Sequence, residues 1–178
     1  MRYMKTMFIM LFACLLFACP AMAEGIEIGT LAPIEFAAEE AAQTLELYCG
    51  PTQGFYRHGV QTLDTGKPYV IFGQYDCWAM AAQGSAESFG PVGWVEAGLL
   101  ANLPYDPQLS FDDALQVTVE DEAVMTNDLM NPDAEPIIRI VPGTAVTLLA
   151  GFGEWGYVQA EFDDMPPVRA FIPMSAIE

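Results

Sequence analysis

The run Tyr69-Val70-Ile71-Phe72-Gly73 has a counterpart 77 residues later, Val146-Thr147-Leu148-Leu149-Ala150. Both runs are apolar, and a glycine closes each of them, at Gly73 and at Gly151. β-Branched and aromatic residues favour strands, and glycine favours the turns that end them. Short apolar runs of this kind, separated by Gly, Pro, Asn and Asp, continue from about residue 44 to the C-terminus. The sequence therefore predicts an all-β fold.

The same offset relates further residues on both sides of the two strands. A period of 77 is too long for a solenoid repeat, so it predicts two tandem copies of one small domain. Domains of about 60 residues bury little surface alone, and we expect the copies to pack against each other. The matched pairs are Leu47-Tyr48 with Val124-Met125, Gly66 with Gly143, Trp78 with Trp155, Trp94-Val95 with Phe171-Ile172, and Leu100 with Ile177. We place the copies at 44–100 and 117–178, joined by a linker at 101–116.

The segment before the first copy, residues 24–43, is expected to be a short, partly helical leader. It contains Ala37-Ala38-Glu39-Glu40-Ala41-Ala42, which is helix-prone but too short to be stable alone. We predict one or two helical turns there.

The N-terminus has the pattern of a signal peptide. Arg2 and Lys5 precede an apolar run at 7–18, and Ala21-Met22-Ala23 provides a small-x-small cleavage site. The run is about 18 Å long as a helix, which is short of a bilayer core of about 30 Å. We therefore expect cleavage after residue 23, no stable membrane insertion, and a periplasmic or secreted protein. A membrane anchor and a lipoprotein modified at Cys19 are the alternatives.

Composition limits the functions open to the chain. Among its 178 residues, 24 are acidic and 6 are basic, which gives a net charge of −18, and 53% are hydrophobic. The apolar content supports a packed core and excludes wholesale disorder. The acidic balance excludes a nucleic-acid partner, which requires a basic surface. It is compatible with recognition by a local groove or with a basic protein partner.

A family resemblance rests on the order of short motifs in both copies. The order resembles the bacterial SH3 (SH3b) domain family. Copy two departs from it with Thr126-Asn127-Asp128 where copy one has Gly50-Pro51, and with Ala170-Phe171 in place of Gly93-Trp94. Copy one supplies Leu45-Glu46-Leu47-Tyr48-Cys49-Gly50-Pro51, Gly59-Val60, Gly66, Val70-Ile71-Phe72, Asp76-Cys77-Trp78, Gly93-Trp94-Val95 and Leu99-Leu100; copy two supplies Pro142-Gly143, Gly153-Glu154-Trp155, Tyr157-Val158 and Phe171-Ile172.

The resemblance implies two small, strongly bent β-barrels and a binding or targeting module, of the kind often attached to the cell wall. It also implies a ligand groove in copy one, with Tyr48 and Trp78 on its flanks and Tyr56 on the long loop nearby. Tyr and Trp dominate binding hot spots. The alternative for Trp78 is a place in the barrel core, which is where we expect Trp94.

Cys49 and Cys77 stay in the chain after the expected cleavage. Two cysteines in an oxidising compartment predict one disulfide, which would contribute about 3–4 kcal/mol in the chain-entropy model. By the family alignment, this bridge would tie the two walls of the groove together. The alternative is a pair of separate buried thiols.

Neither catalysis nor a cofactor is expected. His58 is the only histidine, and two cysteines with one distant histidine do not complete a metal site. The carboxylate clusters are expected to form solvated faces. We therefore expect an exported, non-enzymatic module that binds cell-wall peptide or another extended segment, with peptidoglycan or an envelope protein as the partner. The alternative is a structural or adaptor protein whose two barrels pack on an envelope protein.

Overall fold

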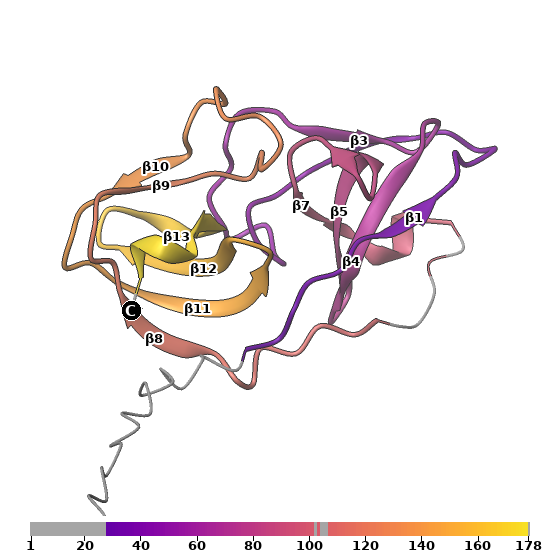
Figure 1. Cartoon of the computed structure of the whole chain (residues 1–178). Helices are drawn as coiled ribbons and strands as arrows, with labels where there is room; N and C mark the ends of the chain where they lie inside the picture. The colour runs from indigo at the N-terminus through magenta and orange to yellow at the C-terminus, as the bar shows by residue number, and fades with distance from the viewer. Residues whose placement is uncertain (1–27, 102, 104–106, 178) are drawn as a thin grey trace, which may run out of the picture.

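The computed structural model describes residues 28–101, 103 and 107–177, and Figure 1 shows them as two β-rich halves that lie side by side. The expected signal peptide and the alternative lipid attachment at Cys19 fall outside these residues. The N-terminal half contains β1 (Ile34–Phe36), β2 (Thr44–Glu46), β3 (Thr62–Asp64), β4 (Tyr69–Tyr75), β5 (Trp78–Ser85), β6 (Ser88–Phe89), β7 (Gly93–Glu96) and the 3-10 turn η1 (Ala97–Leu99). The C-terminal half contains β8 (Leu115–Thr118), β9 (Ala123–Met125), β10 (Ile138–Ile140), β11 (Ala145–Phe152), β12 (Trp155–Phe162), β13 (Met165–Pro173) and η2 (Met174–Ala176).

The all-β prediction is therefore confirmed. Four sheets hold the strands. In one, β1, β4, β5 and β6 follow each other and β7 also pairs with β5; in another, the order is β13-β12-β11-β8; β2 pairs with β3 and β9 with β10. Among the described residues, these ladders do not close into a barrel in either half. Among the described residues, none of the helical segments could span a bilayer.

The two halves repeat each other strand by strand. The bounds of β5 and β12 differ by 77 at both ends, as do those of η1 and η2. The β4–β5 and β11–β12 hairpins share a bulge, which lies between Ile71 and Gly73 in one and between Leu148 and Ala150 in the other. A bulge strengthens the local bend of a strand. The repeat read from the sequence is thus also a repeat of local geometry.

The residues that follow β2 and β9 depart from this offset by one position. Tyr48 bridges Trp94, and the corresponding partner of Phe171 is Thr126 rather than Met125. Met125 is fully buried in the C-terminal core. The position equivalent to Tyr48 is therefore Thr126.

The predicted helical turns in the leader are wrong. Within the described residues 28–43 there is no helix, and β1 pairs with β4 through Ile34 with Ile71 and Phe36 with Tyr69. Phe36 stacks on the Tyr69 ring at 5.4 Å between centroids. Glu39 Oε1 accepts hydrogen bonds from the Tyr69 hydroxyl (2.7 Å) and the Ala101 backbone N–H (2.9 Å). Because these contacts hold the segment extended against β4, they outweigh the weak helical preference of its alanines.

The leader and the linker each cross onto the opposite half. Backbone hydrogen bonds join Leu31 N–H to the Gly151 carbonyl and Gly151 N–H to the Gly29 carbonyl, both 2.8 Å, so the leader lies on β11. In the equivalent place on β4, Gln74 N–H donates to Pro107 and Leu109 N–H donates to Gln74. The two copies therefore exchange their upstream segments, as Figure 1 allows the reader to follow at the lower edge of the molecule.

Further contacts between the halves are reciprocal. Arg169 N–H donates to the Cys49 carbonyl (3.1 Å), and Val92 N–H donates to the Asn127 carbonyl (2.7 Å), so the same two places in the repeat meet twice. Such self-complementary contacts are typical of a two-fold dimer interface. The chain thus has the arrangement of a two-fold dimer joined into one polypeptide.

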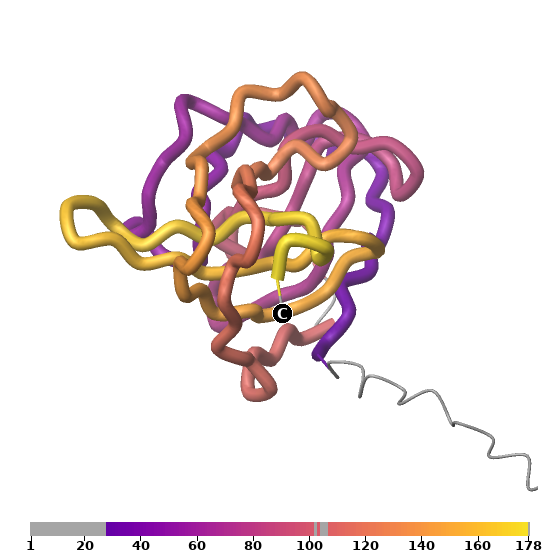
Figure 2. Tube along the Cα trace, turned by 60° about the vertical axis from the view of Figure 1, so that its left-hand side comes forward, coloured from indigo at the N-terminus to yellow at the C-terminus, as the bar shows by residue number. Residues whose placement is uncertain are grey.

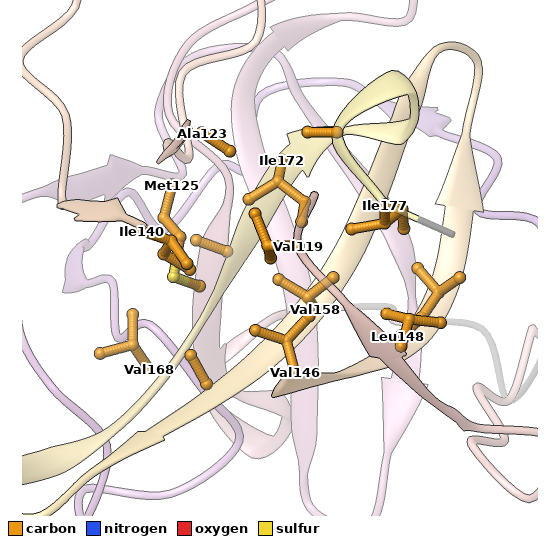
Figure 3. Close-up of a cluster of buried hydrophobic side chains, with 14 of the residues drawn as sticks. Val119, Ala123, Met125, Ile140, Val146, Leu148, Val158, Val168, Ile172 and Ile177 are labelled. Atoms are coloured by element: carbon orange, nitrogen blue, oxygen red, sulfur yellow. The ribbon is translucent and has the colours of Figure 1, made fainter. Parts of the chain in front are cut away.

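Three hydrophobic clusters form the interior. Figure 3 shows the one inside the C-terminal half, built on residues such as Met125, Ile140 and Val158. A second lies inside the N-terminal half around Leu63 and Ile71. The third is shared by both halves and contains Phe72, Phe89, Trp94, Leu149, Tyr157 and Phe171. Trp94 is 1% exposed, which confirms its predicted burial, but it lies in the cluster that both halves share rather than inside one half.

Candidate functional site

Tyr48 and Trp78 lie together on the N-terminal half. Their rings meet edge to face, with centroids 5.5 Å apart, and both side chains are half-buried. Tyr48 follows β2, where its backbone N–H and carbonyl pair with Trp94 at 3.0 and 2.8 Å. Trp78 opens β5 after the tight turn at Asp76 and Cys77. The structure therefore brings together two of the three predicted site residues.

A pair of opposite charges lies beside the Tyr48 ring. The Arg57 guanidinium stacks over this ring at 5.0 Å from its centroid, and Arg57 Nη2 contacts Glu46 Oε2 at 2.8 Å. The Tyr48 hydroxyl also donates to Glu46 Oε2 at 3.3 Å. Both charged side chains are exposed, so the ion pair itself adds little stability. Its effect is to hold the Arg57 guanidinium over the Tyr48 ring.

Tyr56 lies elsewhere. Its side chain packs against the C-terminal core, and its backbone N–H donates to the Pro167 carbonyl at 3.0 Å. The loop that carries Tyr56 thus crosses onto the other half, where Arg169 N–H also bonds Cys49. Tyr56 therefore packs toward the C-terminal half, whereas Tyr48 and Trp78 contact each other.

The predicted disulfide is not formed, and both Cys49 and Cys77 are free thiols. Cys49 is buried and packs into the C-terminal core, whereas Cys77 is exposed in the turn between β4 and β5. Burial raises the pKa of the Cys49 thiol. A raised pKa is the opposite of what a catalytic cysteine needs. The backbone ladder between Tyr48 and Trp94, rather than a bridge, fixes this part of the site.

Equivalent shallow depressions flank Trp78 and Trp155. The first has a volume of about 600 Å³ and the second about 500 Å³. Their linings correspond residue for residue at the offset of 77: Cys77, Trp78, Glu96, Ala97 and Gly98 line one, and Glu154, Trp155, Pro173, Met174 and Ser175 line the other.

A second cavity beside Trp155, of about 220 Å³ and more enclosed, has no match among the sequence predictions. Two differences between the halves explain it. Thr126 makes the bridge that the larger Tyr48 makes in the other half, and the small Ala134 is the residue 77 positions after Arg57. The departure at Thr126-Asn127-Asp128 was the visible sign in the sequence. The cavity is lined by Val124, Thr126, Asp128, Leu129, Asn131, Pro132, Ala134, Pro136 and Trp155.

Arg169 is a second feature that the sequence did not reveal. Its guanidinium lies over the rings of Phe55, Tyr75 and Phe111 at 5.1, 5.9 and 5.1 Å from their centroids. Nε donates to Gln159 Oε1 at 2.8 Å, and among the described residues buried Nη1 has no hydrogen-bond partner. Burial lowers the pKa of this guanidinium. Since the rings come from the N-terminal half and the linker, Arg169 acts as a clamp between the halves.

Acidic, histidine and cysteine side chains do not gather into a metal site in the part of the chain that the structure describes. Comparison of the chain with protein-family models, with curated proteins and with solved structures found no match to any of them.

Proposed function

We propose that this chain is an exported, non-enzymatic binding module that recognises a cell-wall peptide or another extended peptide on the surface formed by Tyr48 and Trp78. The observation that carries the proposal is the edge-to-face contact of these two half-buried rings, 5.5 Å apart. Tyr and Trp side chains provide large contact areas with both apolar and polar parts. Half-buried aromatic pairs of this kind are suited to the side chains and backbone of an extended peptide.

The surface is also held in place before any ligand binds. Tyr48 is fixed through its backbone by Trp94, and its ring is covered on one side by Arg57. Binding to a surface that is already ordered loses less conformational entropy. The neighbouring Arg57 and Glu46 provide a donor and an acceptor for the polar groups of a peptide.

The assignment of two SH3b-like barrels at 44–100 and 117–178 belongs to the same proposal. It is supported by the duplicated bulge, by the duplicated 3-10 turn and by the bridges that attach β2 and β9 to the larger sheets. The extracytoplasmic location rests on the signal-peptide pattern of residues 1–23.

The test is sedimentation of the protein with purified peptidoglycan. We expect saturable binding by the wild type, loss of binding in Trp78→Ala, and binding close to wild type in Trp155→Ala, the same change at the equivalent position. Circular dichroism spectra establish that each variant is folded. Equal loss in both variants contradicts a site on Tyr48 and Trp78. No binding by the folded wild type contradicts the peptidoglycan ligand and favours the adaptor alternative with an envelope protein partner.

A further inference from the structure

We infer that the cavity beside Trp155 is a separate binding site in the C-terminal half, and that it takes an arginine side chain from a partner polypeptide. The inference does not depend on the proposed function, because it concerns the other half and a different ligand chemistry. It rests on the shape of the cavity, on an unpaired carboxylate in its lining and on a comparison of the two halves.

The size of the cavity selects a single side chain. Pockets for drug-sized molecules have volumes of about 300–1,000 Å³. The cavity beside Trp155 has about 220 Å³. Most of its lining is apolar, with Val124, Leu129 and Pro132 as examples. This suits the aliphatic stem of a long side chain, whose polar end then has to meet a polar group.

Asp128 is the polar group that remains to be satisfied. Its backbone N–H bonds Thr126 Oγ1 at 3.1 Å, and Asn131 Oδ1 likewise accepts the Asp133 N–H at 3.2 Å, so these neighbours stabilise the loop. Across the described ranges, the carboxylate of Asp128 joins no salt bridge and accepts no hydrogen bond. It is half-buried and lines the cavity together with Trp155. A carboxylate beside an indole ring is suited to a cation.

The N-terminal half shows what occupies the equivalent place. There the chain supplies its own arginine, because Arg57 stacks on Tyr48 and pairs with Glu46 at 2.8 Å. In the C-terminal half Thr126 takes the place of Tyr48, and the residue 77 positions after Arg57 is Ala134, which lines the cavity. The space that the arginine and the ring fill in one half is open in the other. An arginine from outside would restore the same combination of cation, aromatic ring and carboxylate.

The net charge of the whole molecule also favours a basic partner. The net charge of −18 attracts basic polypeptides and speeds their encounter. At about 0.15 M salt this general attraction is screened beyond about 8 Å. The contribution of the cavity is therefore local, and salt separates it from the general attraction.

The experiment is a titration of the full chain at physiological salt with N-acetyl-arginine methylamide, followed by the NMR resonance of the Trp155 indole N–H. The matched probe is the citrulline analogue, which has nearly the same shape but no charge. We expect a saturable shift with the arginine probe and at least about tenfold weaker binding of the citrulline probe, since charge-assisted hydrogen bonds are about twice as strong as neutral ones.

Three variants locate the site. Asp128→Asn should weaken binding by about tenfold or more, and Thr126→Tyr, which introduces the ring of the N-terminal half, should abolish it. Asp164→Asn is the matched control, because it removes one charge at the turn of the β12–β13 hairpin, which projects from the molecule in Figure 2. Binding to this control should stay within about twofold of wild type, since its charge is exposed and screened.

Equal binding of the two probes, an equal loss in Asp128→Asn and Asp164→Asn, or no saturable shift of Trp155 would each overturn the inference. Asp128→Asn keeps the test decisive if Thr126→Tyr does not fold, because its change of a half-buried carboxylate to an amide preserves the size of the side chain.

Discussion

The hydrogen bond between Trp94 and Tyr157 offers a direct test of how the two halves depend on each other. Trp94 Nε1 donates to the Tyr157 hydroxyl at 2.7 Å, and both residues lie in the cluster that the halves share. Trp94 is 1% exposed and Tyr157 is 2% exposed. At the equivalent positions the chain has Phe171 and Met80, which make no such bond. The perturbation is the pair of variants Trp94→Phe and Tyr157→Phe.

The expected magnitudes follow from this burial. Trp94→Phe leaves the Tyr157 hydroxyl without its donor, at a cost of about 1–3 kcal/mol. It also removes about 40 Å³ of side chain, which adds about 1 kcal/mol at about 24 cal/mol per Å³. Tyr157→Phe leaves a buried indole N–H unpaired, again at about 1–3 kcal/mol. The double variant leaves neither group unpaired. Its free energy of unfolding should therefore fall by only about 1 kcal/mol, the cost of the lost volume, against about 3–7 kcal/mol for the sum of the two single losses.

The assay is urea unfolding followed by far-UV circular dichroism, which does not depend on the substituted tryptophan. Both single variants should lower the midpoint of one cooperative transition, because the bond joins the halves. Additive losses in the double-mutant cycle would refute the claim that the two groups satisfy each other. A separate early transition, unaffected by the variants, would refute the claim that the halves unfold together.

Three further predictions concern buried groups. Burial raises the pKa of Tyr69 and of Tyr157, and Glu39 adds to the effect at Tyr69. Because an unfolded tyrosine ionises near about pH 10, the stability that these two groups contribute should be complete below that pH and fall above it. Urea midpoints measured from pH 8 to pH 11 should show this fall. Constant midpoints over that range would contradict this. Arg169→Lys should destabilise the protein by about 1–2 kcal/mol, since lysine loses the stacking on three rings. Arg169→Met should change stability by less than about 1 kcal/mol. Thermal unfolding of both variants should show that order. Without reductant, Cys77 should react rapidly with a thiol reagent and Cys49 only after unfolding, and a Cys49–Cys77 bridge found by peptide mapping would contradict the free thiols of the structure.

Much of the fold could be predicted from the pattern of residues along the chain. Strands β4 and β11 could be predicted because apolar runs of β-branched and aromatic residues that end at glycine favour a strand over other local structures. The helical turns in the leader were predicted wrongly because alanine propensity is worth only a few tenths of a kcal/mol per residue. The pairing of Phe36 with Tyr69 and the bonds of Glu39 are contacts between distant parts of the chain, and no local rule contains them.

The candidate site was predicted in part. Tyr48 and Trp78 were predicted to flank one groove from the resemblance to SH3b domains, and their rings do meet in the structure. Tyr56 could not be placed, because its surroundings belong to the other half. The cavity beside Trp155 could not be predicted from the sequence either, since a cavity exists only where side chains from several segments fail to fill a space.

The β class, the offset of 77 and the burial of Trp94 could be predicted from the chain because they depend on residue types and their spacing. The crossing of the leader and linker between the halves, the separation of Cys49 from Cys77 and the position of Arg169 among three aromatic rings emerged only from the folded structure. These features depend on packing between segments that are remote in sequence. The gain or loss of a single large side chain there, as with Tyr48 and Thr126, changes which surfaces remain open.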